Sequence, residues 1–306
     1  MAIATREAYG EELAKLIVED PKIVVLDADL TKSTMTIMAK KVCPQRHFDM
    51  GIAEADMMGV AAGFATSGYT VFASSFAMFA TGRAWEQVRN SIAYPHLNVK
   101  ICGTHAGIAV GEDGVSHQAI EDIAIMRVIP GMEVYSPCDG AQTKAVIDYV
   151  SKTKNPTYVR LGRSKVEDVY QPDHKFDLSK IDIVHQGKEV AIFATGLMVQ
   201  ASLEALPQLQ AAGIDPTIVN VCSIKPIDEK GIAEVLKTHS KIVSAEEHNI
   251  IGGLGSAISD VSVKYCPRLI TKIGIQDRFA ESGPFAKLLV KYHLDAQSIV
   301  ETVKKI

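Results

Sequence analysis

The residues with the clearest chemical potential lie in one glycine-rich loop, HAGIAVGEDGVSHQ, which begins at His105. The loop holds two histidines, His105 and His117, and two acids, Glu112 and Asp113. Histidine can act as an acid, a base or a donor near neutral pH, and glycines let the backbone turn tightly against a ligand. The pattern favours a polar binding or catalytic loop. A solvated loop without function and a metal site are the alternatives, but the spacing matches no common zinc pattern.

The elements that would position this loop alternate between short apolar runs and helical patterns. Strands are predicted at residues 23–26, in a run ending near Asp49, and in NVKICGT, MEVYSPCD and PTYVRLG. Helices are predicted between them, including residues 34–42 and the long segment SSFAMFATGRAWEQVR. Alternation of this kind indicates a parallel α/β sheet, whose chemistry lies at the carboxyl ends of the strands. Polar loops follow Leu26, Asp49, Cys102 and Leu161, so we expect them to converge on one edge.

A change in composition divides the chain. Residues 166–188 are polar and lack a sustained apolar face until Ile181, which indicates a linker. A second run of alternating strands and helices begins at EVAIFATG, and GGLGS within it is interpreted as the tight turn that opens a helix. The predicted fold is therefore α/β with two parallel-sheet domains, at residues 1–165 and 189–306, the second of them smaller.

Composition limits the function classes. The 306 residues are 47% hydrophobic, enough for about two domains with sizeable cores. A net charge of -4 and the lack of a long basic run argue against nucleic-acid binding. No run of 18 apolar residues predicts a membrane span, and the N-terminus does not look like a signal peptide. Five scattered cysteines without a CxxC pair fit a reducing compartment, so we expect a cytoplasmic protein.

Five segments, in the same order, resemble motifs of the transketolase family. GEDGVSHQ resembles the family's GEDGPTHQ loop, and DADLTKST resembles its DLTPSN segment. GIAEADM resembles the start of its G-x-x-E-x-x-M helix, SSFAMFATGRAWEQVR its aromatic cofactor helix, and YVRLGRS its strand ending in a substrate arginine. Residues 190–306 are similar to the family's C-terminal domain. The resemblance covers essentially the whole chain and implies transfer of a two-carbon ketol group from a ketose phosphate to an aldose phosphate, with thiamine diphosphate as cofactor.

The resemblance also implies which residues bind the cofactor. Glu54 would hydrogen-bond the aminopyrimidine ring and promote the proton transfer that activates the cofactor. Phe76 and Phe79 would form a stacking wall for the same ring, and Asp29 would lie nearby. Taken alone, Glu54 would be a surface acid favoured by a helix dipole, and the two phenylalanines, three residues apart on a helix, would be core.

Substrate residues follow from the same resemblance. His105, Asp113 and His117 would face the sugar, with both histidines counted as catalytic beside Glu54. Ser33 would donate its hydroxyl to the sugar phosphate. Arg163 would clamp that phosphate, because a guanidinium matches phosphate oxygens. Arg160, two residues earlier on a strand, would point to the same face and is the alternative clamp.

The segment that binds the diphosphate in full-length transketolases, with its GDG…N magnesium motif, has no counterpart here. The resemblance therefore implies the C-terminal subunit of a split enzyme, with Mg²⁺ ligands supplied by an N-terminal partner subunit and none from this chain. The resemblance identifies residues 1–165 as the pyrimidine-binding domain, and self-association through that domain is expected as well. The alternatives are half of a 1-deoxyxylulose-5-phosphate synthase-like enzyme, the beta subunit of a 2-oxo acid dehydrogenase, or a non-catalytic binding paralogue.

Overall fold

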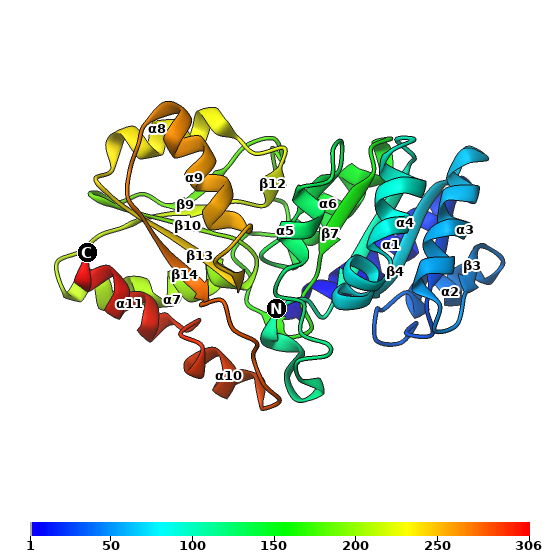
Figure 1. Ribbon diagram of the computed structural model, residues 1–306, viewed down its shortest axis with the longest axis horizontal. Helices are drawn as coiled ribbons and strands as arrows, with labels where there is room; N and C mark the ends of the chain where they lie inside the picture. The colour runs from blue at the N-terminus through cyan, green and yellow to red at the C-terminus, as the bar shows by residue number, and fades with distance from the viewer. Residues whose placement is uncertain (1) are drawn as a thin grey trace.

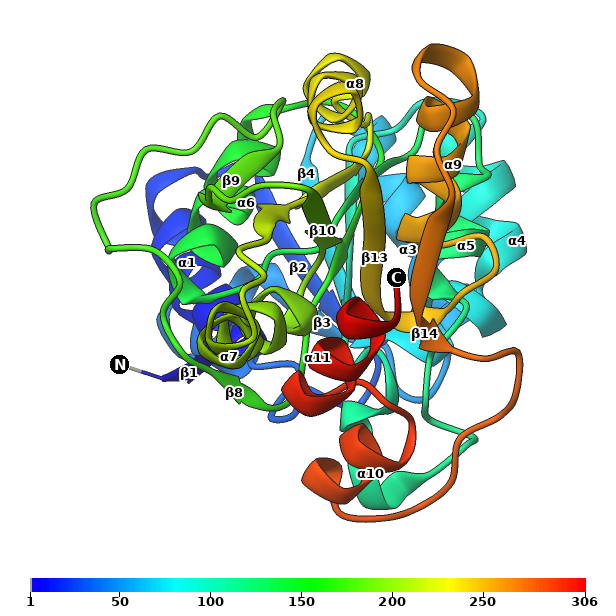
Figure 2. The ribbon, with the colours of Figure 1, turned by 90° about the vertical axis from the view of Figure 1, so that its left-hand side faces the viewer.

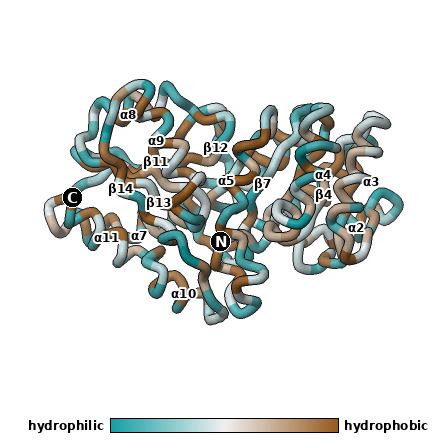
Figure 3. Tube along the Cα trace, viewed as in Figure 1, coloured by the Kyte–Doolittle hydropathy of each residue, from teal (hydrophilic) through white to brown (hydrophobic). Residues whose placement is uncertain are grey.

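The structure, a computed structural model, describes residues 2–306 and places two α/β units side by side (Figure 1). The N-terminus lies near the junction of the two units, and the C-terminus lies at the far end of the second (Figure 1). Hydrophobic stretches run through the inner strands of both units, and hydrophilic stretches run through the outer loops (Figure 3). The predicted α/β class with two domains is confirmed.

The first unit is built on a seven-stranded sheet of order β12-β6-β7-β5-β4-β2-β3, parallel except for β12. Its central strands are buried along their whole length, as expected for a parallel sheet covered on both faces. The strands are β2 (Ile23–Asp27), β3 (His47–Asp49), β4 (Thr70–Phe76), β5 (Val99–Thr104), β6 (Glu133–Tyr135), β7 (Thr157–Arg160) and β12 (Ser223–Lys225).

Helices cover both faces of this sheet and enclose two hydrophobic cores, one under α1, α2 and α6 and the other under α3, η3 and α5. The α-helices are α1 (Thr5–Glu19), α2 (Ile37–Val42), α3 (Glu54–Thr66), α4 (Trp85–Gln87), α5 (Asp122–Arg127) and α6 (Gly140–Lys152). Four further helical segments are the 3₁₀ turns η1 (Pro44–Arg46) and η4 (Ile108–Asp113) and the π-helical turns η2 (Met78–Arg83) and η3 (Val88–Ala93).

The second unit has a five-stranded sheet of order β14-β13-β10-β11-β9, in which only β9 is antiparallel. One face packs on α7 and α11 and the other on α8 and α9. In Figure 2, α8 lies at the top and α7 and α11 lie lower down. The strands are β9 (Asp182–His185), β10 (Val190–Ala194), β11 (Thr217–Asn220), β13 (Lys241–Asn249) and β14 (Ile270–Ile275). The helices are α7 (Leu197–Ala211), α8 (Glu229–Thr238), α9 (Leu254–Tyr265), α10 (Phe285–Lys291) and α11 (Ala296–Lys305).

Two strand pairings complete the first unit, and the second of them joins it to the second unit. A two-stranded antiparallel sheet pairs β1 (Ile3–Ala4) with β8 (Lys165–Val166), so the end of the first unit returns to its beginning. Strand β12 comes after the first strands of the second unit, yet it pairs with β6 of the first sheet. The second half of the chain therefore completes the sheet of the first.

Three local predictions differ from the structure. The helix predicted over residues 34–42 begins only at Ile37, because the hydroxyls of Thr34 and Thr36 bond the carboxylate of Asp27 at 2.6 and 2.9 Å. Phe76 is the last residue of β4, so it does not share a helix with Phe79. Strand β9 is not indicated by the sequence pattern and lies inside the segment 166–188 that was predicted as a linker.

Among residues 2–306, no helix combines the length and the apolarity needed to cross a membrane.

Candidate active site

The loops after β2, β3, β4, β5 and β7 meet at one edge of the first sheet, because these strands are parallel. The loop after β2 is anchored to the end of β3, where the Asp29 N–H donates to Asp49 Oδ1 at 2.9 Å. Asp29 itself is exposed and has a φ of 58°, an uncommon conformation for a residue other than glycine. The convergence of polar loops expected from the sequence is thus present.

Asp27, the last residue of β2, lies beneath the loop that follows this strand and bonds to it. Its carboxylate is fully buried and accepts hydrogen bonds from Thr34, Thr36 and the Leu30 N–H. Burial raises its pKa to about 6, against the opposing effect of these hydrogen bonds. The loop above it lines an open pocket of about 410 Å³ that includes Asp29 and Ser33.

Glu54 occupies the first position of α3, where the free N–H groups of a helix end favour a carboxylate. It is only 1% exposed, although it is an acid. Its Oε2 accepts from Arg83 Nη1 at 2.7 Å, and no described hydrogen bond within residues 2–306 reaches Oε1. Glu54 therefore presents a buried carboxylate with one oxygen available to a ligand.

Four ring side chains gather beside this carboxylate. Phe76 stacks on His105 with ring centroids 3.9 Å apart, and it stacks on Phe79 at 6.1 Å. The His117 ring meets Phe79 edge-on at 5.1 Å. The Arg83 guanidinium lies 4.6 Å from the centre of the Phe79 ring and so joins the aromatic cluster to Glu54. Residues from three different loops thus form one surface.

His105 is held neutral. Its ring is buried, and its φ of 58° bends the backbone at the end of β5. Burial, and then the charges of Arg6, Arg163 and His117, lower its pKa to about 3. A neutral imidazole at this position can donate or accept a hydrogen bond at any physiological pH.

The rest of the loop runs across the front of the site. His117 is half-buried and its Nδ1 lies 2.9 Å from Ser116 Oγ. Asp113 lies at the exposed end of η4 and forms no hydrogen bond with His105 or His117 within the described residues. Both histidines therefore reach the aromatic cluster, and Asp113 is further out in solvent.

Positive charge collects next to His105. Arg163 follows β7, is partly exposed, donates to the Val110 carbonyl, and lies 3.5 Å from Glu112. Arg6 donates to the Ser33 backbone carbonyl at 2.6 Å, and the charge of Arg163 helps to lower its pKa, after burial. The two guanidiniums are thus near neighbours of each other and of Ser33, a suitable arrangement for an anionic group.

Arg160 is already engaged inside the protein. Its side chain is 7% exposed, its Nε donates to Asp122 Oδ2 at 2.8 Å, and its Nη2 donates to the Glu247 carbonyl at 2.8 Å. The Arg163 side chain, in contrast, is 39% exposed at the edge of the site.

The sequence analysis assigns no role to three residues of this neighbourhood: Arg83, Arg6 and Glu247. Arg83 is four residues from Phe79, a spacing that could have suggested contact on a helix. Arg6 and Glu247 reach the site from opposite ends of the chain, and no local pattern could have shown it.

The donor set suits a flat heteroaromatic ring. Aromatic planes from Phe76 and Phe79 offer stacking, and the open Oε1 of Glu54 offers an acceptor for a ring N–H. The aminopyrimidine of thiamine diphosphate is flat, and its imino tautomer carries a ring N–H, so the residues present fit that half of the cofactor.

Comparison with known proteins points to one family. The family model for the transketolase pyrimidine-binding domain matches residues 1–168, and that for the transketolase C-terminal domain matches residues 179–299. A protein of Methanocaldococcus jannaschii, described provisionally as a transketolase C-terminal section, is 48% identical over 97% of this chain and 94% of its own length.

Two further proteins extend the comparison. The 6-deoxy-6-sulfo-D-fructose transketolase subunit of a Clostridium species is 37% identical over 98% of this chain and 94% of its own length. A solved split-gene transketolase, described as an inactive beta4 tetramer, is 49% identical and superposes with a TM-score of 0.90. That superposition covers 100% of this chain and 98% of the other.

Proposed function

The chain belongs to the transketolase family, and on this premise we propose that it is the C-terminal subunit of a split transketolase. It would transfer a two-carbon ketol group from a ketose phosphate to an aldose phosphate with thiamine diphosphate. The observation that carries the proposal is the buried carboxylate of Glu54 beside the Phe76–Phe79 wall, at the strand-end edge of a pyrimidine-binding domain.

When bound, thiamine diphosphate supplies the carbanion chemistry that breaks and forms the carbon–carbon bonds. Phe76 and Phe79 would hold the aminopyrimidine by stacking, and Asp29 would border it. Glu54 Oε1 would accept the ring N–H and so hold a proton at the position that cofactor activation requires. Arg83 keeps the Glu54 side chain in place through its 2.7 Å ion pair.

The substrate would lie against the loop that runs from His105 to His117. A neutral His105 and the half-buried His117 can donate hydrogen bonds to sugar oxygens and stabilise negative charge on a carbonyl oxygen. Asp113 would accept from a sugar hydroxyl. Arg163 and the Ser33 hydroxyl would bind the phosphate, with Arg6 adding positive charge behind them.

An N-terminal subunit would complete the enzyme. This chain matches the pyrimidine-binding and C-terminal models, and the groups that bind the diphosphate and Mg²⁺ would come from a partner. Support comes from the split-gene transketolase structure, which is described as an inactive tetramer of one kind of chain. The partner would dock over the loops that carry Asp29, Glu54 and His117, and the chain would self-associate through its pyrimidine-binding domain.

The test is reconstitution. This chain is purified alone, given thiamine diphosphate and Mg²⁺, and assayed for ketol transfer between sugar phosphates with and without the N-terminal subunit. We expect turnover only in the mixture, because each subunit supplies one half of the cofactor site. Full turnover by the lone chain would disprove the split-enzyme proposal.

A further inference from the structure

Three consecutive residues at the end of β13, Glu246, Glu247 and His248, reach three different segments of the protein, although all three are buried. Glu246 accepts the N–H groups of Leu254 and Gly255 at 2.6 and 2.9 Å, and so caps α9 in its own unit. His248 Nε2 lies 3.4 Å from the N–H of Ala124 in α5 of the first unit. Only Glu247 contacts the loop of the candidate active site.

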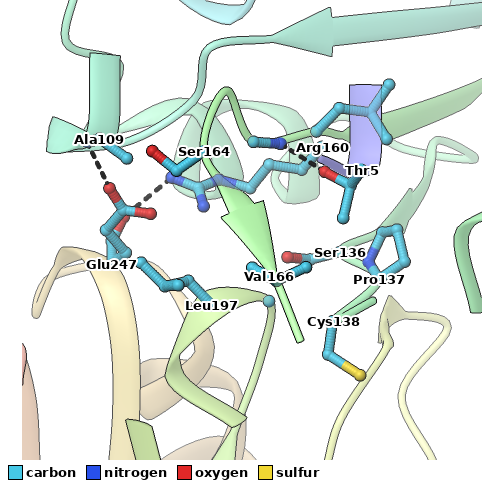
Figure 4. Close-up of a pocket in the computed structure, with 13 residues that line it drawn as sticks. Thr5, Ala109, Ser136, Pro137, Cys138, Arg160, Ser164, Val166, Leu197 and Glu247 are labelled. Carbon is cyan, nitrogen blue, oxygen red and sulfur yellow. Dashed lines mark hydrogen bonds between the residues drawn. The ribbon is translucent and has the colours of Figure 1, made fainter. Parts of the chain in front are cut away.

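Glu247 points to the other face of β13, because side chains alternate along a strand. Its Oε1 accepts from the Ala109 N–H at 2.7 Å (Figure 4). Gly107 lies so close that a Cβ there would be 2.4 Å from the carboxyl carbon of Glu247. The loop is therefore folded directly around this side chain.

The loop is closed at its base by the bond from the Gly107 N–H to the Ala119 carbonyl at 2.8 Å, and turn bonds follow around Gly114. Gly107, Gly111 and Gly114 all have positive φ, and η4 is a short turn broken at Gly111. Beyond Glu247, its support from the second unit is the segment before α10, where Gln118 Nε2 donates to the Glu281 carbonyl at 2.9 Å. The loop lies beside α10 in both Figure 1 and Figure 2.

The backbone of Glu247 is held by a buried polar group of the first unit. Arg160 Nη2 donates to its backbone carbonyl at 2.8 Å, and Arg160 is itself paired with Asp122 (Figure 4). A cavity of about 30 Å³, room for about one water molecule, borders Glu247, Arg160 and Ser136. Burial raises the pKa of Glu247 to about 7, against the opposing effect of Arg160 and the Ala109 N–H.

We propose that Glu247 is a positioning residue, through which the second unit holds the loop from His105 to His117 in its substrate-binding shape. A carboxylate that accepts the Ala109 N–H and packs against Gly107 fixes a turn that the glycines alone would leave free. The consequence for catalysis rests on the proposed function, but the contact itself does not. The C-terminal domain thereby acts on the substrate site without contacting the substrate.

The first measurement is amide hydrogen exchange of the full chain without partner or cofactor. We expect Glu247→Ala to speed exchange across residues 106–118 by about tenfold or more, because the buried Ala109 N–H loses its acceptor and the space beside Gly107 is left empty. Glu247→Gln keeps an acceptor oxygen and should recover most of the protection. The matched control is Asp228→Ala, which removes a carboxylate that caps α8 of the same unit and accepts the Ile181 N–H, and it should speed exchange there but not in the loop.

The second measurement uses the assembled enzyme. Glu247→Ala should lower kcat/KM for sugar phosphates by about tenfold or more and leave proton exchange at the thiazolium carbon unchanged, since Glu54 is not on the loop. Unchanged loop exchange in Glu247→Ala, or equal loop exchange in Asp228→Ala, would overturn the proposal. If Glu247→Ala fails to fold, Glu247→Asp, whose shorter side chain withdraws the carboxylate from Ala109, carries the same test. If the proposed function is wrong, the wild-type mixture of both subunits would be inactive, while Glu247→Ala would still speed amide exchange in the loop.

Discussion

At the scale of single residues, the site depends on acids and bases that the fold keeps in unusual surroundings. Glu54 is buried, and its negative charge is balanced by the N-terminus of α3 and by the guanidinium of Arg83. His105 is buried beside two arginines and stays neutral, since its pKa falls to about 3. One group is therefore placed to accept a proton and the other to donate a hydrogen bond without changing charge.

The prediction at this scale concerns Glu54. Glu54→Gln keeps the shape of the side chain but removes its ability to take up charge, so cofactor activation should fall by about 100-fold or more. The measurement is proton–deuterium exchange at the thiazolium carbon in the assembled enzyme. The matched control is Glu86→Gln, on the exposed surface of α4, which should exchange at the wild-type rate. A wild-type rate in Glu54→Gln would refute the assignment.

At the scale of elements, Arg163 links two segments: it lies in the segment after β7 and contacts the loop after β5. The Thr5 hydroxyl accepts the Gly162 N–H at 2.7 Å and fixes the start of that segment. Arg163 then reaches the Val110 carbonyl and the carboxylate of Glu112. The guanidinium is thus held at the edge of the site by one carbonyl and one weak ion pair.

We predict that Arg163→Ala raises the KM for phosphorylated acceptors by about 30-fold, equivalent to about 2 kcal/mol of lost phosphate binding. Acceptors without a phosphate should change little. Steady-state kinetics on both classes of acceptor are the measurement, and Glu112→Gln is the companion variant, since it frees Arg163 and should not raise KM. Equal losses on both classes would mean that Arg163 only braces the loop.

The sequence predicts an element well where a local pattern of residues determines it, and poorly where it depends on distant contacts. The strands ending at Asp27 and Asp49 and the helix beginning at Glu54 follow from local periodicity and punctuation, and so does the turn at Gly252 before α9. The π-helical turn η2 does not, because an i→i+5 bond leaves no separate pattern in composition. It is nevertheless this turn that places Phe79 and Arg83 against Phe76 and Glu54.

Long-range pairings are the other part that local patterns cannot predict. Strand β12 joins the sheet of the first unit through β6, 88 positions earlier at Ser223 and Tyr135. The Glu247–Ala109 bond spans 138 positions. The family resemblance identified Glu54, Phe76 and the two histidines because each lies in or next to a contiguous motif. It gave no role to Arg6 and Glu247, because these residues approach the site only through the fold.

At the scale of the whole molecule, the two units are joined by a buried polar cluster as well as by β12. Arg160 pairs with Asp122, which also accepts from the Tyr158 hydroxyl at 2.6 Å, and Arg160 bonds the Glu247 carbonyl across the junction. Lys225 in β12 donates to the Arg127 carbonyl at 2.8 Å. With the junction closed by such groups, we expect the two units to unfold together.

Arg160→Ala tests this expectation. It leaves the buried carboxylate of Asp122 without its cation and cuts the link to Glu247, so the free energy of unfolding should fall by about 3–5 kcal/mol. The matched control is Lys152→Ala, which breaks the exposed Lys152–Asp148 pair on α6 and should cost no more than about 0.5 kcal/mol. Urea unfolding would be followed by the fluorescence of Trp85, the sole tryptophan, for the first unit and by hydrogen exchange of β13 for the second. In the wild type the two transitions should coincide, because neither unit is complete without the other. Separate transitions in the wild type, or a loss in Arg160→Ala no greater than in Lys152→Ala, would mean that the cluster does not couple the units.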